Sequence, residues 1–332
     1  LKNSFLIYKC LKKFFHNKNL LSWFNLSILI KSFHVLKHII KFNPSSVTVF
    51  TTRLGFMIPY LKILNQNLKI NYCIFADPYK NPDFYKVNYD WYRECLLSSN
   101  VVLSSSNYCA NSVKNYAPEI NTKSIYIGVD LDRFNIKISL NQIRENLSLP
   151  NKPIVLFLAR MEKEMGVENA LEIAKKVIDN NSNIVFVIAG AYGKKTKDVK
   201  IYEKKYQGRL FCRVNVSYDD LPHYFASADI LIAPTVGNHA CMGVSIKEAM
   251  ASGLPSIVSN SGGIPEAIRN NREGIIVPLN QKSKIDNQLF CNSIINLIYD
   301  EKKLKFMKKN SKKRVKELFD INSTFLKYLD II

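Results

Sequence analysis

The chain has 332 residues, 47% of them apolar, and its 47 basic and 27 acidic residues give a formal net charge of +20. This length and apolar content predict a globular protein of two domains and exclude a disordered chain. The seven cysteines are dispersed, without a CxxC pair or a metal-binding spacing, which indicates reduced thiols in a cytoplasmic protein rather than a disulfide framework.

The basic charge is concentrated near the start of the chain. Residues 1–76 contain eleven Lys or Arg and no acid, so that the first carboxylate is Asp77. Aromatic residues such as Phe14 and Trp23 are interleaved with these lysines, a pattern typical of segments that bind anionic membrane surfaces. A bias toward lysine, with 37 Lys against ten Arg, explains the same charge without any partner. The sequence contains no helix-turn-helix, zinc-finger or RNA-binding pattern, so we expect no nucleic-acid partner.

No stretch in this region is long enough to span a bilayer. The apolar run at residues 20–30 is interrupted by Ser22, Asn25 and Ser27 and is too short. We therefore expect a cytoplasmic protein that lies peripherally on the inner face of the membrane.

The first part of the chain alternates between predicted strands and helices. Strands are expected at residues 47–50, 70–75, 101–103 and 124–127, and helices at 1–18, 27–42, 56–64, 82–97 and 105–116. This alternation predicts a parallel sheet. A Rossmann domain has six strands, and the chain starts at Leu1 rather than Met, so we expect an incomplete N-terminal domain. No GxGxxG motif occurs, which argues against a nicotinamide cofactor. His34 and His38 have a metal-compatible spacing, but no third ligand accompanies them, and packing or surface roles are favoured.

A second α/β region follows a linker at residues 135–152 that contains one short helix. Strands are predicted at 153–159, 183–189, 210–214, 230–233, 256–259 and 275–277, and helices at 166–179, 219–227, 244–251, 286–299 and 302–318, with a helix starting at 264 and a tail from 323. In parallel sheets, ligands bind at the carboxyl ends of strands and beside helix N-termini, whose free N–H groups attract anions. Glu248 lies one turn inside the helix at 244–251, so its carboxylate is expected near such a site.

Four segments, taken together and in order, resemble the family-4 retaining glycosyltransferases of GT-B fold. They are GVDLDRF at residues 128–134, FLAR followed by Gly166 at 157–166, YDDLPHYFASAD at 218–229, and KEAMASGLP with GGIPE at 247–266. The resemblance covers roughly residues 70–280, and each piece alone is a weak signal.

This resemblance implies two Rossmann-like domains that face each other across a cleft. The expected divisions are an acceptor-side domain at 1–134, the linker at 135–152, a nucleotide-sugar-binding domain at 153–315 and a helical tail at 316–332. The implied reaction transfers a sugar with retention from a nucleotide sugar to a glycan or lipid-linked acceptor, as in surface polysaccharide or glycolipid synthesis. It uses no metal and no cofactor, because the nucleotide sugar is a co-substrate.

The resemblance also assigns residues to the donor site. Arg160 matches the family's phosphate-binding Arg, whose guanidinium can hold phosphate oxygens bidentately. Glu248 matches the second Glu of its E-x7-E motif, which accepts a ribose hydroxyl. Gly243 and Val244 match the loop whose N–H groups face the diphosphate, and Glu266 matches the acid of its GG.PE motif.

At three positions the chain departs from the family's pattern. The first Glu of E-x7-E, the loop Lys and the N-terminal His fall at Ala240, Met165 and Ala76 respectively. Neighbouring residues could replace them: His239 could contact the sugar, Lys163 the phosphate, and Asp77 could act at the catalytic centre beside Arg160. The alternatives to a glycosyltransferase are a non-catalytic binding or partner subunit of the same fold and, disfavoured by the motifs, a basic membrane- or nucleic-acid-associated module.

Overall fold

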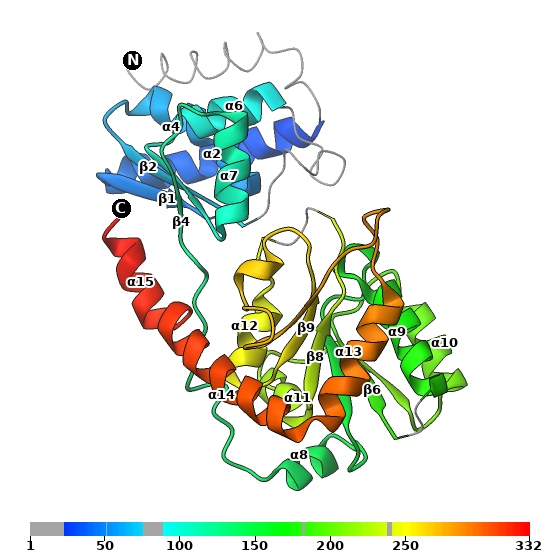
Figure 1. The fold of residues 1–332 in the computed structure, drawn as a ribbon. Helices are drawn as coiled ribbons and strands as arrows, with labels where there is room; N and C mark the ends of the chain where they lie inside the picture. Colours follow the sequence, from blue (N-terminus) through cyan, green and yellow to red (C-terminus); the bar gives the residue numbers. More distant parts are fainter. Residues whose placement is uncertain (1–22, 51, 76–88, 181–182, 238–240) are drawn as a thin grey trace. The chain divides into compact units, whose positions relative to one another are not determined.

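The computed structural model describes residues 23–332 except 51, 76–88, 181–182 and 238–240 (Figure 1). The chain forms two compact units, which comprise residues 1–125 with 328–332 and residues 126–327. The chain therefore crosses between the units twice. The segment at 135–152, which the sequence suggests is a linker, belongs to the second unit. The assignment of acceptor and donor roles to the domains stays a prediction.

The first unit contains a four-stranded parallel sheet whose strands follow chain order. Its strands are β1 (Ser46–Val49), β2 (Lys69–Ile74), β3 (Val101–Ser104) and β4 (Thr122–Ser124). Its helices are α2 (Trp23–Phe42), α3 (Thr52–Gly55), α4 (Ile58–Leu64), α6 (Tyr89–Leu97) and α7 (Asn107–Tyr116). The central strands β2 and β3 are almost wholly buried, as expected for parallel strands covered on both faces.

The second unit contains a six-stranded parallel sheet. Its strands are β5 (Ile154–Leu158), β6 (Val185–Gly190), β7 (Leu210–Val214), β8 (Ile230–Ala233), β9 (Ser256–Ser259) and β10 (Gly274–Val277). The connecting elements are α8 (Leu140–Asn146), η2 (Lys163–Met165), α9 (Val167–Asn180), α10 (Thr196–Lys205), α11 (Leu221–Ser227), α12 (Val244–Ala251), η3 (Ile264–Glu266), α13 (Asn287–Tyr299), α14 (Glu301–Leu318) and α15 (Ile321–Leu329).

Helices cover both faces of this sheet, so each strand is buried on both sides. Successive side chains of β5 point to opposite faces. Val155 and Phe157 pack with α9 and α13 in one apolar cluster, whereas Leu156 and Leu158 pack with α11 and α12 in the other. This two-sided burial explains why the strands are continuous apolar runs rather than alternating ones.

The structure confirms the α/β class and most of the predicted elements. The strands at 230–233 and 256–259 and the helix at 244–251 have the predicted bounds. α10 was not predicted, because most of its side chains are polar. The helix predicted at 1–18 and part of that at 82–97 lie outside the described residues.

Several predicted elements are wrong in extent. The strand predicted at 124–127 ends at Ser124, after which the Ile127 carbonyl accepts a hydrogen bond from a lysine of α12. The helix predicted from Ile264 is one 3-10 turn, because hydrogen bonds between Arg269 and Glu273 turn the chain toward β10. The helix predicted at 56–64 begins only at Ile58, and α3 precedes it.

Candidate functional site

The strand order of the second unit reverses between β5 and β8. Counted from β5, the strands lie in the order 3-2-1-4-5-6 across the sheet, which is that of a Rossmann domain. The connections from β5 and β8 therefore leave toward opposite sides, and the carboxyl ends of these two strands border a crevice. A ligand site is therefore expected at the loops that follow β5 and β8.

The loop after β5 carries two exposed cations, Arg160 and Lys163. Within the described part of the chain, neither side chain has an ion pair or a hydrogen bond. Lys195, in the next loop along the sheet, forms ion pairs with Glu168 and Asp198, and hydrogen bonds to these carboxylates raise its pKa. Arg160 and Lys163 thus keep their charge available for an anion.

The loops after β5 and β8 are packed directly against each other. Gly166 has a φ of 85°, and a Cβ there would lie 2.6 Å from the Pro234 carbonyl oxygen. The Thr235 hydroxyl donates to the Met165 carbonyl at 3.2 Å, and Asn169 donates to that of Pro234 at 2.9 Å. Met165 thus contributes its carbonyl to loop packing, at the position where the family resemblance places a lysine.

α12 begins in the loop after β8. Its N-cap is Gly243, with a φ of 73° and no side-chain hydrogen bond to the first turn. The first N–H groups of the helix are therefore left without a side-chain cap, and the neighbouring Val244 is 44% exposed. Hydroxyls at and just past the end of β9 hold this loop in place, because Ser259 donates to the Thr235 carbonyl and Ser261 to that of Gly237. Such an N-terminus can bind an anion.

Glu248 is 8% exposed, so it is almost buried although it carries a carboxylate. Desolvation raises its pKa, and the charges of Lys247 and Arg133 oppose that shift. No protein donor to this carboxylate is found among the described residues. A desolvated carboxylate without a protein donor can accept hydroxyl groups of a ligand.

Lys247 was missed by the sequence reasoning. Its side chain is fully buried, and its Nζ donates to the Ile127 carbonyl at 2.8 Å and lies 5.6 Å from the centroid of the Phe319 ring. Desolvation lowers its pKa to about 8. The signal in the sequence is a lysine inside an otherwise apolar and small-residue helix, VSIKEAMA.

Lys247 joins α12 to two separate segments of the second unit, one around Ile127 and one around Phe319. The Val129 N–H donates to the Phe319 carbonyl at 2.7 Å, and the Ile321 N–H donates to that of Val129 at 3.1 Å. The segment around Ile127 and the segment around Phe319 are therefore bonded to each other beside the buried ammonium. The helix that carries Glu248 is thus anchored to both segments.

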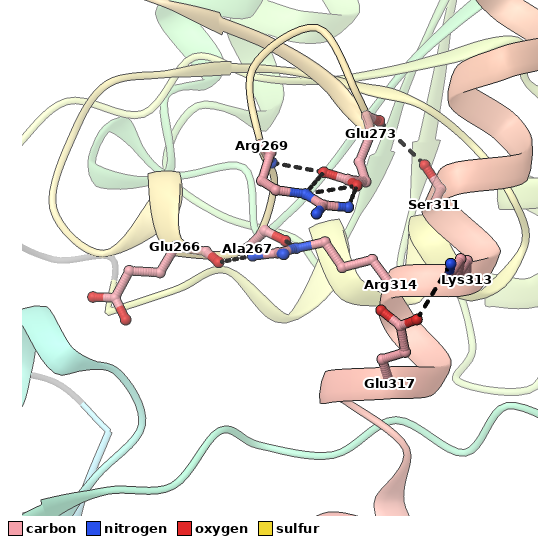
Figure 2. Close-up of polar contacts among 8 residues, drawn as sticks. All are labelled: Glu266, Ala267, Arg269, Glu273, Ser311, Lys313, Arg314 and Glu317. Atoms are coloured by element: carbon pink, nitrogen blue, oxygen red, sulfur yellow. Dashed lines mark hydrogen bonds and ion pairs between the residues drawn. The ribbon is translucent and has the colours of Figure 1, made fainter.

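Glu266 lies in η3, and α14 holds its backbone in place (Figure 2). Arg314 donates to the Glu266 carbonyl at 3.0 Å and to the Ala267 carbonyl at 2.9 Å. Figure 2 also shows Arg269 paired with Glu273, whose carbonyl accepts a hydrogen bond from Ser311. The Glu266 carboxylate points away from Arg314 and accepts a bond of 3.4 Å from the Tyr126 hydroxyl.

The structure thus places Arg160, Lys163, Gly243 and Val244 on loops at the carboxyl edge of one sheet, with Glu248 one turn inside α12 and Glu266 after β9. Asp77, His239, Ala76 and Ala240 lie outside the described residues, so their assigned roles stay predictions. No cluster of three or more His, Cys, Asp or Glu suited to a metal is found in the described ranges. None of the described helices is long and apolar enough to span a membrane.

The family model of the glycosyl transferases group 1 matches residues 140–314. The chain belongs to this family. The match contains the whole site in the second unit, from the cationic loop after β5 to the end of η3. An Escherichia coli UDP-Gal:alpha-D-GlcNAc-diphosphoundecaprenol alpha-1,3-galactosyltransferase is 29% identical over 202 residues, which are 58% of this chain and 49% of that protein. The chain spans about half or less of the length of such curated relatives.

Solved structures confirm the GT-B fold of this glycosyl transferases group 1 chain. A sucrose-phosphate synthase from Thermosynechococcus elongatus has a TM-score of 0.78 at 17% identity, over 90% of this chain and 76% of that one. HepE from Anabaena, solved in complex with UDP-glucose, has a TM-score of 0.76 at 15% identity, over 90% of this chain and 81% of its own. At such identities the likeness concerns the fold.

The buried ammonium of Lys247 makes a prediction about stability and pH. Its folded-state pKa of about 8 lies below the ordinary lysine value of 10.5, so between these values the unfolded chain binds more protons than the folded one. The free energy of unfolding should therefore gain up to about 3 kcal/mol from this group as the pH rises from 8 to 10.5. In Lys247→Met this gain should be absent. Urea unfolding of both proteins at several pH values measures it, and parallel pH profiles would contradict it.

Proposed function

We propose that the chain is a retaining, metal-independent glycosyltransferase that moves a sugar from a nucleotide-sugar donor to a glycan or lipid-linked acceptor. The observation that carries this proposal is a pair of cations, Arg160 and Lys163, that have no ion pair within the described ranges. Their loop packs against the one leading to the N-terminus of α12, which has no side-chain cap. A nucleoside diphosphate gains negative charge as its bond to the sugar breaks. Fixed cations and helix N–H groups stabilise that charge without a bound metal.

The names of similar proteins support a nucleotide sugar as the donor. The Escherichia coli relative is named for UDP-Gal, a Mycobacterium tuberculosis relative is GDP-mannose-dependent, and HepE was solved with UDP-glucose. In our proposal Glu248 accepts the ribose hydroxyls, while the N–H groups of Gly243 and Val244 face the diphosphate. Glu266 and His239 contact the sugar side of the donor, and Asp77 acts with Arg160 at the reacting bond.

A non-catalytic binding subunit is the second candidate. It is favoured by Met165, which stands where the resemblance places a phosphate-binding lysine, and by Ala240, where it places a sugar-holding glutamate. Lys163 compensates for the first change in our proposal, because it is exposed two residues earlier in the same loop. Donor hydrolysis measured with a panel of nucleotide sugars separates the two candidates.

We also propose that the protein works at the anionic inner face of a membrane, in surface polysaccharide or glycolipid synthesis. The E. coli relative acts on a diphosphoundecaprenol-linked sugar, as its name states. α2 contains no acid, and it exposes Lys37 and Lys41 beside Ile30, Ile40 and Phe42, which are 63%, 52% and 73% exposed. Such a mixture of cations and apolar side chains suits an anionic lipid surface.

The role of Arg160 is tested by Arg160→Ala. Removal of one preorganised charge-stabilising group should lower kcat/KM for donor use by roughly 10²-fold or more. Arg272→Ala is the matched control, because Arg272 is exposed but precedes β10 and so lies at the opposite edge of the parallel sheet. A loss below about threefold in Arg160→Ala would remove Arg160 from the reaction.

Glu248→Gln tests the ribose contact. Because charge-assisted hydrogen bonds are stronger than neutral ones, affinity for nucleoside diphosphates should fall by about 1–2 kcal/mol, or roughly 5–30-fold. Free nucleoside diphosphate and intact donor should be weakened equally. Ala240→Glu is the control, which should leave nucleoside-diphosphate affinity unchanged and alter the choice of sugar. If calorimetry shows that Glu248→Gln binds nucleoside diphosphates as tightly as the parent protein, the donor-site assignment is wrong.

The membrane proposal is tested by sedimentation with vesicles at low salt. The protein should bind anionic but not neutral vesicles, and added salt should weaken binding. Each lysine contributes about 1 kcal/mol, so neutralising two with Lys37→Gln and Lys41→Gln should reduce binding by about 30-fold. The control pair Lys305→Gln and Lys309→Gln removes the same charge from α14. Equal loss in both pairs, or equal binding to neutral vesicles, contradicts a surface on α2.

A further inference from the structure

A large aromatic side chain stands at the carboxyl edge of the donor-side sheet without an assigned role. Tyr192 follows the end of β6, in the segment GAYG, and it is 60% exposed. β6 pairs with β5, whose following loop carries Arg160, so the loops after these two strands are neighbours at the same edge.

The backbone at Tyr192 is fixed from both sides. The Met161 N–H donates to the Ala191 carbonyl at 3.0 Å, which ties this loop to the residue after Arg160. On the other side, the Tyr192 N–H donates to the Asn215 side chain at 3.1 Å, just past the end of β7. Tyr192 is therefore held between the loop after β5 and the end of β7.

The ring itself has no protein partner among the described residues. No ring contact, cation–π contact or hydroxyl hydrogen bond involves it. Tyr218, which is equally exposed at 59%, provides a contrast, because the Arg133 guanidinium lies 3.7 Å from the centroid of its ring. Tyr192 thus offers an uncovered aromatic surface on a rigid backbone.

The site geometry indicates what would reach this surface. The cationic loop after β5 can hold the diphosphate. Glu248 lies close enough to Arg133 for that charge to act on it, and Arg133 is bonded to the Tyr218 carbonyl and Asp219, in the segment after β7. A nucleotide that contacts both Arg160 and Glu248 therefore extends from the loop after β5 toward β7. The strand between β5 and β7 is β6, which Tyr192 follows.

We propose that Tyr192 is the stacking platform for the base of the nucleotide, and so a binding and specificity residue for the donor. This inference rests on the proposed function. Every nucleobase presents a π face that can stack on an aromatic ring, and such stacking is independent of hydrogen-bond pattern. The platform would bind the base, whereas Arg160 binds the phosphates, so the two contacts can be separated by experiment.

The experiment is calorimetric titration of Tyr192→Ala, Tyr192→Phe and the parent protein with nucleoside diphosphates and with inorganic pyrophosphate, which lacks a base. Loss of stacking in Tyr192→Ala should weaken nucleoside-diphosphate binding by roughly 5–150-fold. Pyrophosphate affinity should stay within about twofold of the parent, because the phosphate contacts remain. Tyr192→Phe keeps the ring and should retain nucleoside-diphosphate affinity.

Tyr299→Ala is the matched control, because Tyr299 is 54% exposed but lies at the last residue of α13. It should change neither affinity. Equal nucleoside-diphosphate binding by Tyr192→Ala and the parent overturns this inference alone and leaves the proposed function in place. Parallel loss of pyrophosphate and nucleoside-diphosphate affinity also overturns it, because the substitution would then have distorted the phosphate loop. If the parent binds no nucleoside diphosphate, the proposed function itself fails.

Discussion

The close approach of backbones at the carboxyl ends of β5, β6 and β8 is the constraint on which the site depends. A Cβ at Gly190 would lie 1.9 Å from the Ala159 carbonyl oxygen, and one at Gly166 would lie 2.6 Å from that of Pro234. Both residues have positive φ values, which glycine adopts without strain. Because the backbones of these loops are in contact, the residues that follow each contact have little freedom to move. This restricts the positions of Arg160, Tyr192 and the start of α12.

The distribution of ionisable groups in the second unit follows from burial. Arg160 and Lys163 are exposed at the open edge, where water solvates their charge. One turn into α12, Lys247 and Glu248 are buried, and desolvation moves the pKa of each toward its neutral form. The cost of burying Lys247 is offset by its bond to the Ile127 carbonyl. The helix that bears the carboxylate is thereby anchored to the segments around Ile127 and Phe319.

The strands of the second unit could be predicted because they are buried on both faces. Continuous apolar runs such as ILIA at 230–233 indicate such strands, and Gly253 and Pro255 mark the end of α12. Predictions from shorter sequence patterns were wrong where a tertiary contact decides the local structure. Nothing in the sequence around Glu266 shows that Arg269 binds Glu273, four residues further on, and shortens the helix expected there.

For the site, the sequence by itself determined the residue types and their order. The resemblance of KEAMASGLP and FLAR to family motifs predicts Glu248 and Arg160 as site residues, because both motifs depend only on local spacing. Only the tertiary structure decided that Arg160 and Lys163 lack acidic partners among the described residues while Lys195 has two, and that Lys247 reaches the Ile127 carbonyl. These facts arise between residues 3 to 120 positions apart, and local sequence patterns carry no information about which of many charged side chains meet. The strand order 3-2-1-4-5-6 is likewise a property of the packed sheet, since the pattern of alternating strands and helices is the same for other orders.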